Sequence, residues 1–249
     1  MNFQNSNQFQ PKYKFYATLL DSFHYYLNNE YSTFQEFIDK INRVPFISEK
    51  AEKGTAFNNL VDLVAAGKIQ SLYDDGLLSE RIVRNNQVIR YIHTSNDGGT
   101  WMFDFKPAVV FAFAEAYKNA IPQLRTVGYL DTPLGLVELY GNLDELEGDI
   151  VTDIKTTDKY DFPKFLHNYQ HLVYPFTLNQ QGIPVTKFRY HITDFSNIYV
   201  EEYVYNPERD IERLKSHCMH LINFLEMHRH LITDKKVFAM DQQEEAING

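Results

Sequence analysis

Residues 125–156 limit the choice of fold more than any other segment, because they predict three strands in immediate succession. Apolar and polar residues alternate within each strand, and proline or glycine marks the reversals between them. The strands and turns are, in order, Arg125–Asp131, Thr132-Pro133, Leu134–Asp144, Gly148-Asp149 and Ile150–Thr156. Strands joined this closely pair antiparallel, so the segment predicts part of a central sheet.

Helical patterns precede and follow this segment, and a second predicted hairpin lies between the last two helices. The expected helices are Tyr16–Asn28, Thr33–Arg43, Glu49–Ala66 after an N-cap at Ser48, a helix capped by Asp104 with Pro107 in its first turn that reaches Ile121, Pro163–Gln180 and Pro207–Leu231; the hairpin is Val185–Asp194 with Asn197–Tyr205. This order predicts an α/β fold with a central mixed sheet flanked by helices. We interpret residues 1–249 as a single domain with an insertion at 68–104, where short strands are expected at Arg81–Val83 and Gln87–His93.

Composition narrows the class of protein. The chain is 44% hydrophobic, enough for one sizeable core, yet its apolar runs are too short for a membrane span. Its one cysteine, Cys218, excludes a disulfide framework and an iron–sulfur cluster held by this chain alone. Residues 1–8 lack the basic and apolar regions of a signal peptide, so we expect a cytoplasmic protein without a membrane partner. A net charge of −9 is the opposite of the broad basic surface of a protein that coats DNA.

Three residues around the Gly148 reversal could carry chemistry. Side chains alternate along a strand, so Asp153 and Lys155 share one face while Ile154 points to the other. The reversal brings Asp144 beside Asp153, and two converging carboxylates suit Mg²⁺ or Mn²⁺. An ammonium nearby can orient a metal-bound water and offset the charge of a phosphate. Taken alone, Asp-x-Lys is a weak motif, and an inert, solvated hairpin is the alternative.

Further residues strengthen the functional interpretation. Gln170 and Tyr174 are spaced i,i+4 on a predicted helix and therefore share a face. Thr156-Thr157 follow the lysine directly, and Gly54-Thr55 lie in a helical segment about ninety residues upstream.

In this order the motifs resemble the RecB-like branch of the PD-(D/E)XK nucleases. That branch reads Gly-Thr-x-x-His, Gly-x-x-Asp, Asp-x-Lys-Thr and Gln-x-x-x-Tyr. The matching residues here are Gly54-Thr55, Gly141 with Asp144, Asp153 with Lys155-Thr156, and Gln170 with Tyr174. The resemblance spans roughly residues 48–205 and leaves 68–104 unmatched.

The resemblance implies a restriction-endonuclease-like core and a phosphodiesterase that uses Mg²⁺ or Mn²⁺. Asp144 and Asp153 would bind the metal, the backbone carbonyl of Ile154 would complete its site, and Lys155 would assist the attacking water. Gln170 and Tyr174 would position the substrate backbone or the lysine. The expected substrate is DNA, cleaved by an exonuclease, or alternatively an endonuclease, of replication, recombination or phage biology that could work within a protein complex.

Two positions depart from the family pattern. Asn58 stands where many relatives have a histidine ligand, and an amide oxygen is a weaker, neutral ligand. Asp62, one turn later on the same face, is an alternative ligand, and an ordinary polar helix face is another interpretation of both. Pro175 follows Tyr174 directly and predicts a disturbance of the helix there.

Two other functions stay open at this stage. A relative that kept the fold but lost cleavage would act as a nucleic-acid-binding or assembly protein, an alternative that Asn58 and the acidic charge support. A metabolite-binding α/β protein is the other, although the sequence has no glycine-rich phosphate loop. In the insertion, the basic residues Arg81, Arg84, Arg90 and His93 fit either a DNA-contacting arm or a charged edge strand.

Overall fold

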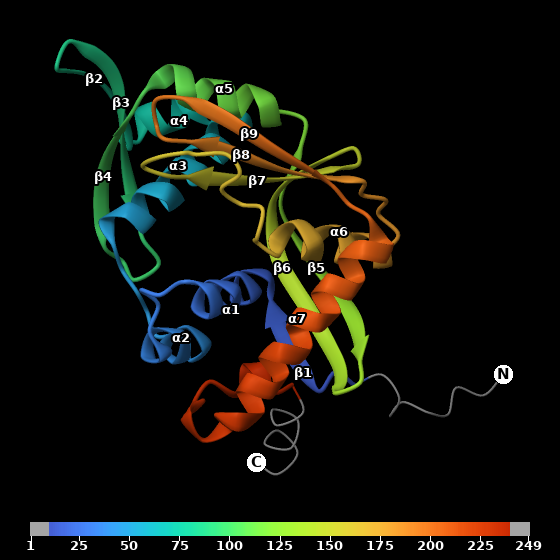
Figure 1. The fold of residues 1–249 in the computed structure, drawn as a ribbon. Coiled ribbons are helices and arrows are strands. Elements are labelled where there is room, and N and C mark those ends of the chain that lie inside the picture. The colour runs from blue at the N-terminus through green and yellow to red at the C-terminus, as the bar shows by residue number, and fades with distance from the viewer. Residues whose placement is uncertain (1–9, 240–249) are drawn as a thin grey trace.

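The computed structural model describes residues 10–239, so residues 1–8, considered above for a signal peptide, lie outside the described part (Figure 1). Within that part, the main sheet has six strands in the order β1-β6-β7-β8-β9, with β5 on the other side of β6. The strands are β1 Tyr13–Tyr16, β5 Ile121–Thr132, β6 Gly135–Glu147, β7 Ile150–Thr156, β8 Lys187–Thr193 and β9 Ile198–Val204. β1 runs parallel to β6 and β7 parallel to β8, and the other pairs are antiparallel.

Helices cover both faces of this sheet. One hydrophobic core joins it to α1 Ala17–Asn28, α2 Phe34–Ile41, α6 Gln170–Gln180 and α7 Pro207–Met227. A second core, on the side of Ile154, contains α3 Glu49–Ala65 and α5 Pro107–Tyr117 (Figure 1). The prediction of an α/β fold with a mixed sheet flanked by helices is therefore confirmed. None of the helices in the described part is long and apolar enough to cross a membrane.

Residues 68–104, the predicted insertion, form most of a second sheet that packs on α3 and α5. Helix α4 Ile69–Asp74 leads into a three-stranded antiparallel sheet of β2 Leu78–Val83, β3 Asn86–Thr94 and β4 Thr100–Phe105. Phe103 and Phe105 on its inner face are buried in the second core. The basic residues do not form one face, because His93 is buried beside Glu52 while Arg90 points outward and pairs with Asp104.

Several element boundaries follow the local signals in the sequence. Ser48 caps α3, accepting a hydrogen bond from the backbone N–H of Ala51 at 3.1 Å. Thr33 and Glu36 form a capping box at the start of α2. Pro107 occupies the first turn of α5, as expected, but Asp104 does not cap this helix. It lies in β4 and accepts two hydrogen bonds from the Arg90 guanidinium, at 2.7 and 2.8 Å.

Three other predictions were wrong in detail. Tyr16 ends strand β1 instead of opening a helix, because Tyr13–Tyr16 pair with residues 137–140 of β6. Ile121 begins β5, since α5 already ends at Tyr117. Helix α6 begins at Gln170, and Pro163 lies in a loop before it.

Glu201 of strand β9 holds the loop before α6 in a non-helical conformation. The backbone N–H groups of Lys164 and Phe165 donate to the Glu201 carboxylate, at 2.7 and 3.1 Å. These N–H groups are thereby satisfied without a helix.

Candidate active site

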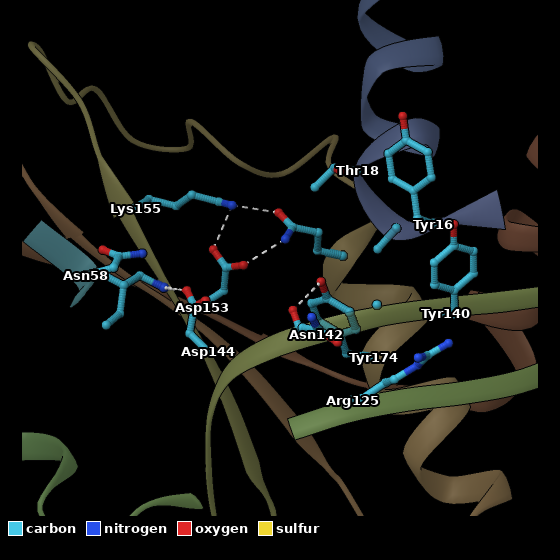
Figure 2. Close-up of a pocket in the computed structure, with 14 residues that line it drawn as sticks. Tyr16, Thr18, Asn58, Arg125, Tyr140, Asn142, Asp144, Asp153, Lys155 and Tyr174 are labelled. Carbon is cyan, nitrogen blue, oxygen red and sulfur yellow. Dashed lines mark hydrogen bonds and ion pairs between the residues drawn. The ribbon is translucent and has the colours of Figure 1, made fainter. Parts of the chain in front are cut away.

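A gap in strand pairing creates the candidate site. On one side β6 pairs with β5 along nearly its whole length. On its other side it pairs with β1 over residues 137–140 and with β7 only over 145–147. Residues 141–144 therefore have no strand neighbour there among the described residues. The diverging strands border a cavity of about 510 Å³ (Figure 2).

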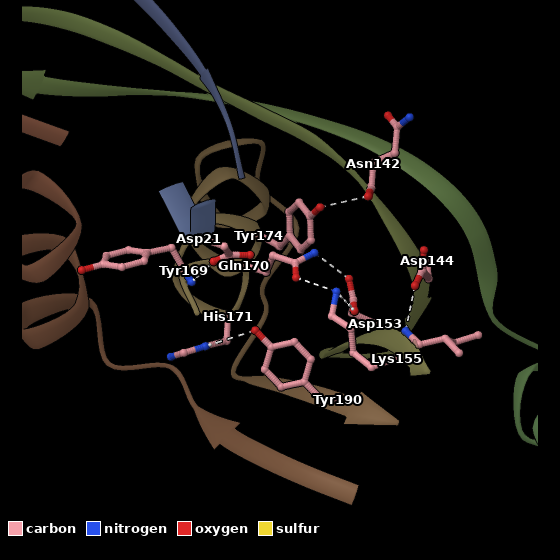
Figure 3. Close-up of polar contacts among 11 residues, drawn as sticks. Asp21, Asn142, Asp144, Asp153, Lys155, Tyr169, Gln170, His171, Tyr174 and Tyr190 are labelled. Atoms are coloured by element: carbon pink, nitrogen blue, oxygen red, sulfur yellow. Dashed lines mark hydrogen bonds and ion pairs between the residues drawn. The ribbon is translucent and has the colours of Figure 1, made fainter. Parts of the chain in front are cut away.

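Asp144 and Asp153 meet where β6 and β7 separate. Their last pair is Glu145 with Thr152, and the next position along the two strands brings Asp144 opposite Asp153. An Asp144 carboxylate oxygen accepts the backbone N–H of Ile154 at 2.7 Å, which satisfies an amide at the split (Figure 3). The predicted proximity of the two carboxylates is thus what the structure shows.

Gln170 connects the second carboxylate to the lysine. Its amide nitrogen donates to Asp153 Oδ1 at 2.7 Å, and its amide oxygen accepts from Lys155 Nζ at 2.7 Å (Figure 3). Lys155 Nζ also lies 2.7 Å from Asp153 Oδ2. Because Gln170 is the first residue of α6, the position of that helix fixes all three side chains.

Tyr174 closes the floor of the cavity one turn further along α6. Its hydroxyl donates to the backbone carbonyl of Asn142 at 3.0 Å, at the unpaired part of β6. A Cβ atom at Gly141 would lie 2.6 Å from Tyr174 Cε1, so only glycine lets the ring pack this closely. Pro175 lies within α6, and the helix nevertheless continues to Gln180.

Asp21 is a supporting residue that the sequence interpretation missed. It belongs to α1, and its carboxylate accepts the backbone N–H of Tyr169, immediately before Gln170 (Figure 3). Tyr169 is the N-cap residue of α6 and makes no side-chain cap, so Asp21 gives its backbone N–H the partner that an N3 glutamate supplies in a capping box. Burial raises the pKa of Asp21 to about 6. No sequence signal could reveal a cap that lies 148 residues away.

Helix α3 contributes Asn58 to the cavity. Its side-chain Oδ1 is buried without a hydrogen-bond partner among the described residues. The helix lies close to β7, because a Cβ at Gly54 would come within 2.7 Å of Thr156 Oγ1. Asp62 lies outside the cavity lining and accepts from Gln123 Nε2 at 3.2 Å. The structure thus favours Asn58 over Asp62 as the residue of α3 that faces the carboxylates.

The site concentrates negative charge in a buried place. Burial, together with the neighbouring Asp153 carboxylate, raises the pKa of Asp144 to about 7. Burial also raises the pKa of Glu145, on the other face of β6, to about 8, and the nearby Asp62 and Asp144 add to the shift. Burial lowers the pKa of Lys155, but the surrounding carboxylates outweigh it and the net shift is upward. A bound cation would offset the repulsion among these carboxylates.

The donors of the site are suited to a hard divalent cation. Asp144 and Asp153 offer anionic oxygens, and Asn58 offers a buried amide oxygen without a partner. Within residues 10–239, no group of three or more His, Cys, Asp and Glu side chains is arranged to hold a metal. A cation here would therefore depend on two carboxylates supplemented by neutral oxygens.

The fold and the site together define an α/β protein with a buried carboxylate–lysine–amide centre. No known family profile matches the chain, and no curated protein matches it. Among solved structures it is similar to the one described as "Crystal structure of SSO0001", with 12% identity and a TM-score of 0.35, over 76% of this chain and 86% of that one. A similarity at this level carries no argument about fold family or function.

Proposed function

We propose that the chain is a metal-dependent nuclease of the PD-(D/E)XK superfamily, RecB-like branch, that hydrolyses phosphodiester bonds of DNA as an exonuclease. One observation supports this most: residues from strands β6 and β7 and helix α6 converge in one cavity as a single hydrogen-bonded unit. Gln170 joins Asp153 to Lys155, and Asp144 lies directly across from Asp153. An inert surface hairpin needs no such arrangement, and Asp153 is only 4% exposed.

The residues divide the chemistry between them. Asp144, Asp153, the side chain of Asn58 and the carbonyl of Ile154 would hold Mg²⁺ or Mn²⁺, which supplies an activated water and neutralises phosphate charge. Lys155 offers N–H donors to the water or to a phosphate oxygen. Gln170 positions Lys155 and Asp153 relative to each other through its two hydrogen bonds. Tyr174 supports β6, the strand that carries Asp144, through its hydrogen bond to Asn142.

A second function has specific support from Asn58. If the neutral amide is too weak a ligand to retain the cation, the protein binds DNA without cleaving it. The two functions are separated by incubating the purified chain with linear and circular DNA in Mn²⁺, Mg²⁺ or chelator.

We expect metal-dependent loss of linear DNA, with Mn²⁺ at least as effective as Mg²⁺, because Mn²⁺ tolerates irregular ligand sets better. Survival of circular DNA would identify an exonuclease. DNA binding without cleavage in either metal would support the non-cleaving function, and equal cleavage in chelator would overturn the metal mechanism.

A further inference from the structure

The cavity extends beyond the carboxylates to a second end that the metal chemistry leaves unused. This end is lined by Tyr16 and Thr18, at the junction of β1 and α1, and by Arg125 and Tyr140 (Figure 2). It lies over the part of β6 that carries Asn142, beside the gap between β1 and β7. A nucleic-acid strand whose scissile phosphate lies at the carboxylates must continue into a neighbouring region of the protein. This end of the cavity is such a region.

Arg125 is suited to bind an anion at this end. It lies on β5 opposite Asn142, and its guanidinium makes no hydrogen bond or ion pair with any residue in the range 10–239. Two cations that contact Tyr140 are already engaged: Arg43 lies 3.3 Å from Asp234, and Lys14 lies 2.7 Å from Glu138. Lys155, at the carboxylate end of the same cavity, is paired with Asp153. A phosphate at this end would therefore be bound by Arg125.

Tyr16 and Tyr140 give the same end an aromatic wall. Their ring centroids are 6.2 Å apart and the rings are tilted by 59°. Arg43 fixes the pair, since it donates to the Tyr140 hydroxyl at 2.8 Å and lies 5.2 Å from the centroid of the Tyr16 ring. Both tyrosines are partly exposed, and Lys14 Nζ lies 5.1 Å from the centroid of the Tyr140 ring, so a ligand would meet the part of the aromatic surface that Lys14 and Arg43 leave free.

We propose that this end is a nucleotide subsite. Arg125 binds the phosphate next to the scissile phosphate, and the Tyr16–Tyr140 wall packs against the base of the nucleotide that joins these two phosphates. The proposal rests on the proposed nuclease function and names the form of its substrate. A base can reach this wall only when it is unpaired, because a base inside a duplex has its faces covered by its neighbours. The strand that enters the site is therefore single-stranded at this position.

The test measures binding rather than cleavage. In an Asp153→Asn background, with Ca²⁺ present, fluorescence anisotropy follows a labelled single-stranded oligonucleotide and the corresponding blunt duplex. Arg125→Ala and Tyr140→Ala should each weaken single-strand binding about tenfold or more, and the duplex should bind more weakly than the single strand. Arg125→Ala should also lower the slope of log affinity against log salt by about 0.7, the value for one phosphate contact on a single strand.

Matched variants separate the subsite from general damage. Tyr140→Phe keeps the aromatic ring but loses the hydroxyl that accepts from Arg43, so it should weaken single-strand binding less than Tyr140→Ala. Arg189→Ala, in a residue paired with Glu202 outside the cavity, and Tyr129→Ala, on the exposed part of β5, should each bind within about twofold of the parent. Unchanged binding in Arg125→Ala and Tyr140→Ala, or equal binding of duplex and single strand, would overturn the subsite even if the protein cleaves DNA. If Arg125→Ala and Tyr140→Ala weaken binding but the wild-type protein does not cleave DNA, the subsite is supported and the nuclease function is overturned.

Discussion

One carboxylate oxygen of Asp153 accepts a hydrogen bond from Gln170, and the other lies 2.7 Å from Lys155 Nζ as an ion pair. A group in this position cannot rotate freely toward a ligand, so its geometry is set before a cation arrives. Such preorganisation is what strengthens electrostatic catalysis in a buried site. Because these contacts hold the side chain in place, exchanging one carboxylate oxygen of Asp153 for an amide nitrogen should affect metal binding more than the fold.

Asp153→Asn should retain the fold and lose cleavage by about two orders of magnitude or more, near 3 kcal/mol in the activation barrier. The side-chain volume hardly changes, but an anionic ligand becomes neutral and metal binding weakens. Initial rates on linear DNA and Mn²⁺ titration of the same preparation measure the two effects. Asp131→Asn, in an exposed residue at the end of β5, is the control. Full activity in Asp153→Asn would place the metal site elsewhere.

Asn58→His should tighten Mn²⁺ binding, because imidazole is a stronger ligand for transition metals than an amide oxygen. Asn58→Ala should weaken binding only modestly, since the two carboxylates provide most of the attraction. Asp62→Ala should have little effect on affinity, because Asp62 contacts Gln123 and does not line the cavity. Calorimetric titration of the three variants decides which residue of α3 faces the ion, and a large loss in Asp62→Ala alone would reverse the assignment.

At the scale of elements, α6 depends on α1 for its start. Its first residues have unpaired N–H groups, and the Asp21 carboxylate accepts that of Tyr169. Asp21→Ala should therefore lower the free energy of unfolding by about 1 kcal/mol, as for the loss of an N-cap. It should also lower the cleavage rate, because Gln170 is the next residue and positions Lys155.

Asp21→Asn is the conservative partner in this experiment, since an amide oxygen can still accept the same N–H. We expect it to restore most of the stability and rate lost in Asp21→Ala. Urea unfolding and single-turnover cleavage, measured side by side, test the coupling. A stable Asp21→Ala protein with unchanged cleavage would show that α6 is positioned by packing alone.

Local patterns predicted some elements well and others poorly. Strand β7 has the predicted bounds, Ile150–Thr156, because a glycine reversal and strict alternation define it locally. Strand β1 was missed because its four residues become a strand only by pairing with residues 137–140. The start of α6 was misplaced because Glu201, from β9, holds the loop before it. Long-range partners decided what local propensity could not.

The candidate site was predictable to a similar extent. Alternation along β7 and the Gly148 reversal place Asp144, Asp153 and Lys155 together, as the structure shows. The supporting contacts were not accessible in the same way, because Asp21 reaches the site from the distant helix α1, and Arg125 lies on β5 outside the strands that carry the carboxylates. Neither residue belongs to a motif, so only the three-dimensional arrangement reveals them.

At the scale of the whole molecule, buried histidines make stability depend on pH. Burial lowers the pKa of His171 to about 3 and of His217 to about 4. Both are neutral when folded, whereas in the unfolded chain they take up protons near pH 6.5. Their contribution to stability is therefore complete above about pH 6.5 and is lost as the pH falls toward 4, at up to about 1.4 kcal/mol per pH unit for each histidine.

His171→Phe isolates one of these contributions. Phenylalanine preserves the stacking on Tyr203, where the rings are 4.5 Å apart, but cannot take up a proton. Urea unfolding between pH 7.5 and 5 should show a shallower loss of stability in the variant than in the parent. Equal pH slopes would mean that His171 contributes nothing to the acid sensitivity.

The contact between Asp21 and the turn before Gln170 also has a consequence for biosynthesis. A ribosome that has made the first 160 residues has already produced both carboxylates and the lysine, but not the helix that aligns them. Contacts between distant parts of a chain form late, so the centre assembles only when α6 has left the ribosome and met α1. The proposed nuclease would therefore stay inactive on nearby DNA until synthesis has passed α6. A chain that ends at residue 160 should accordingly show no cleavage in the assay that the full-length protein passes.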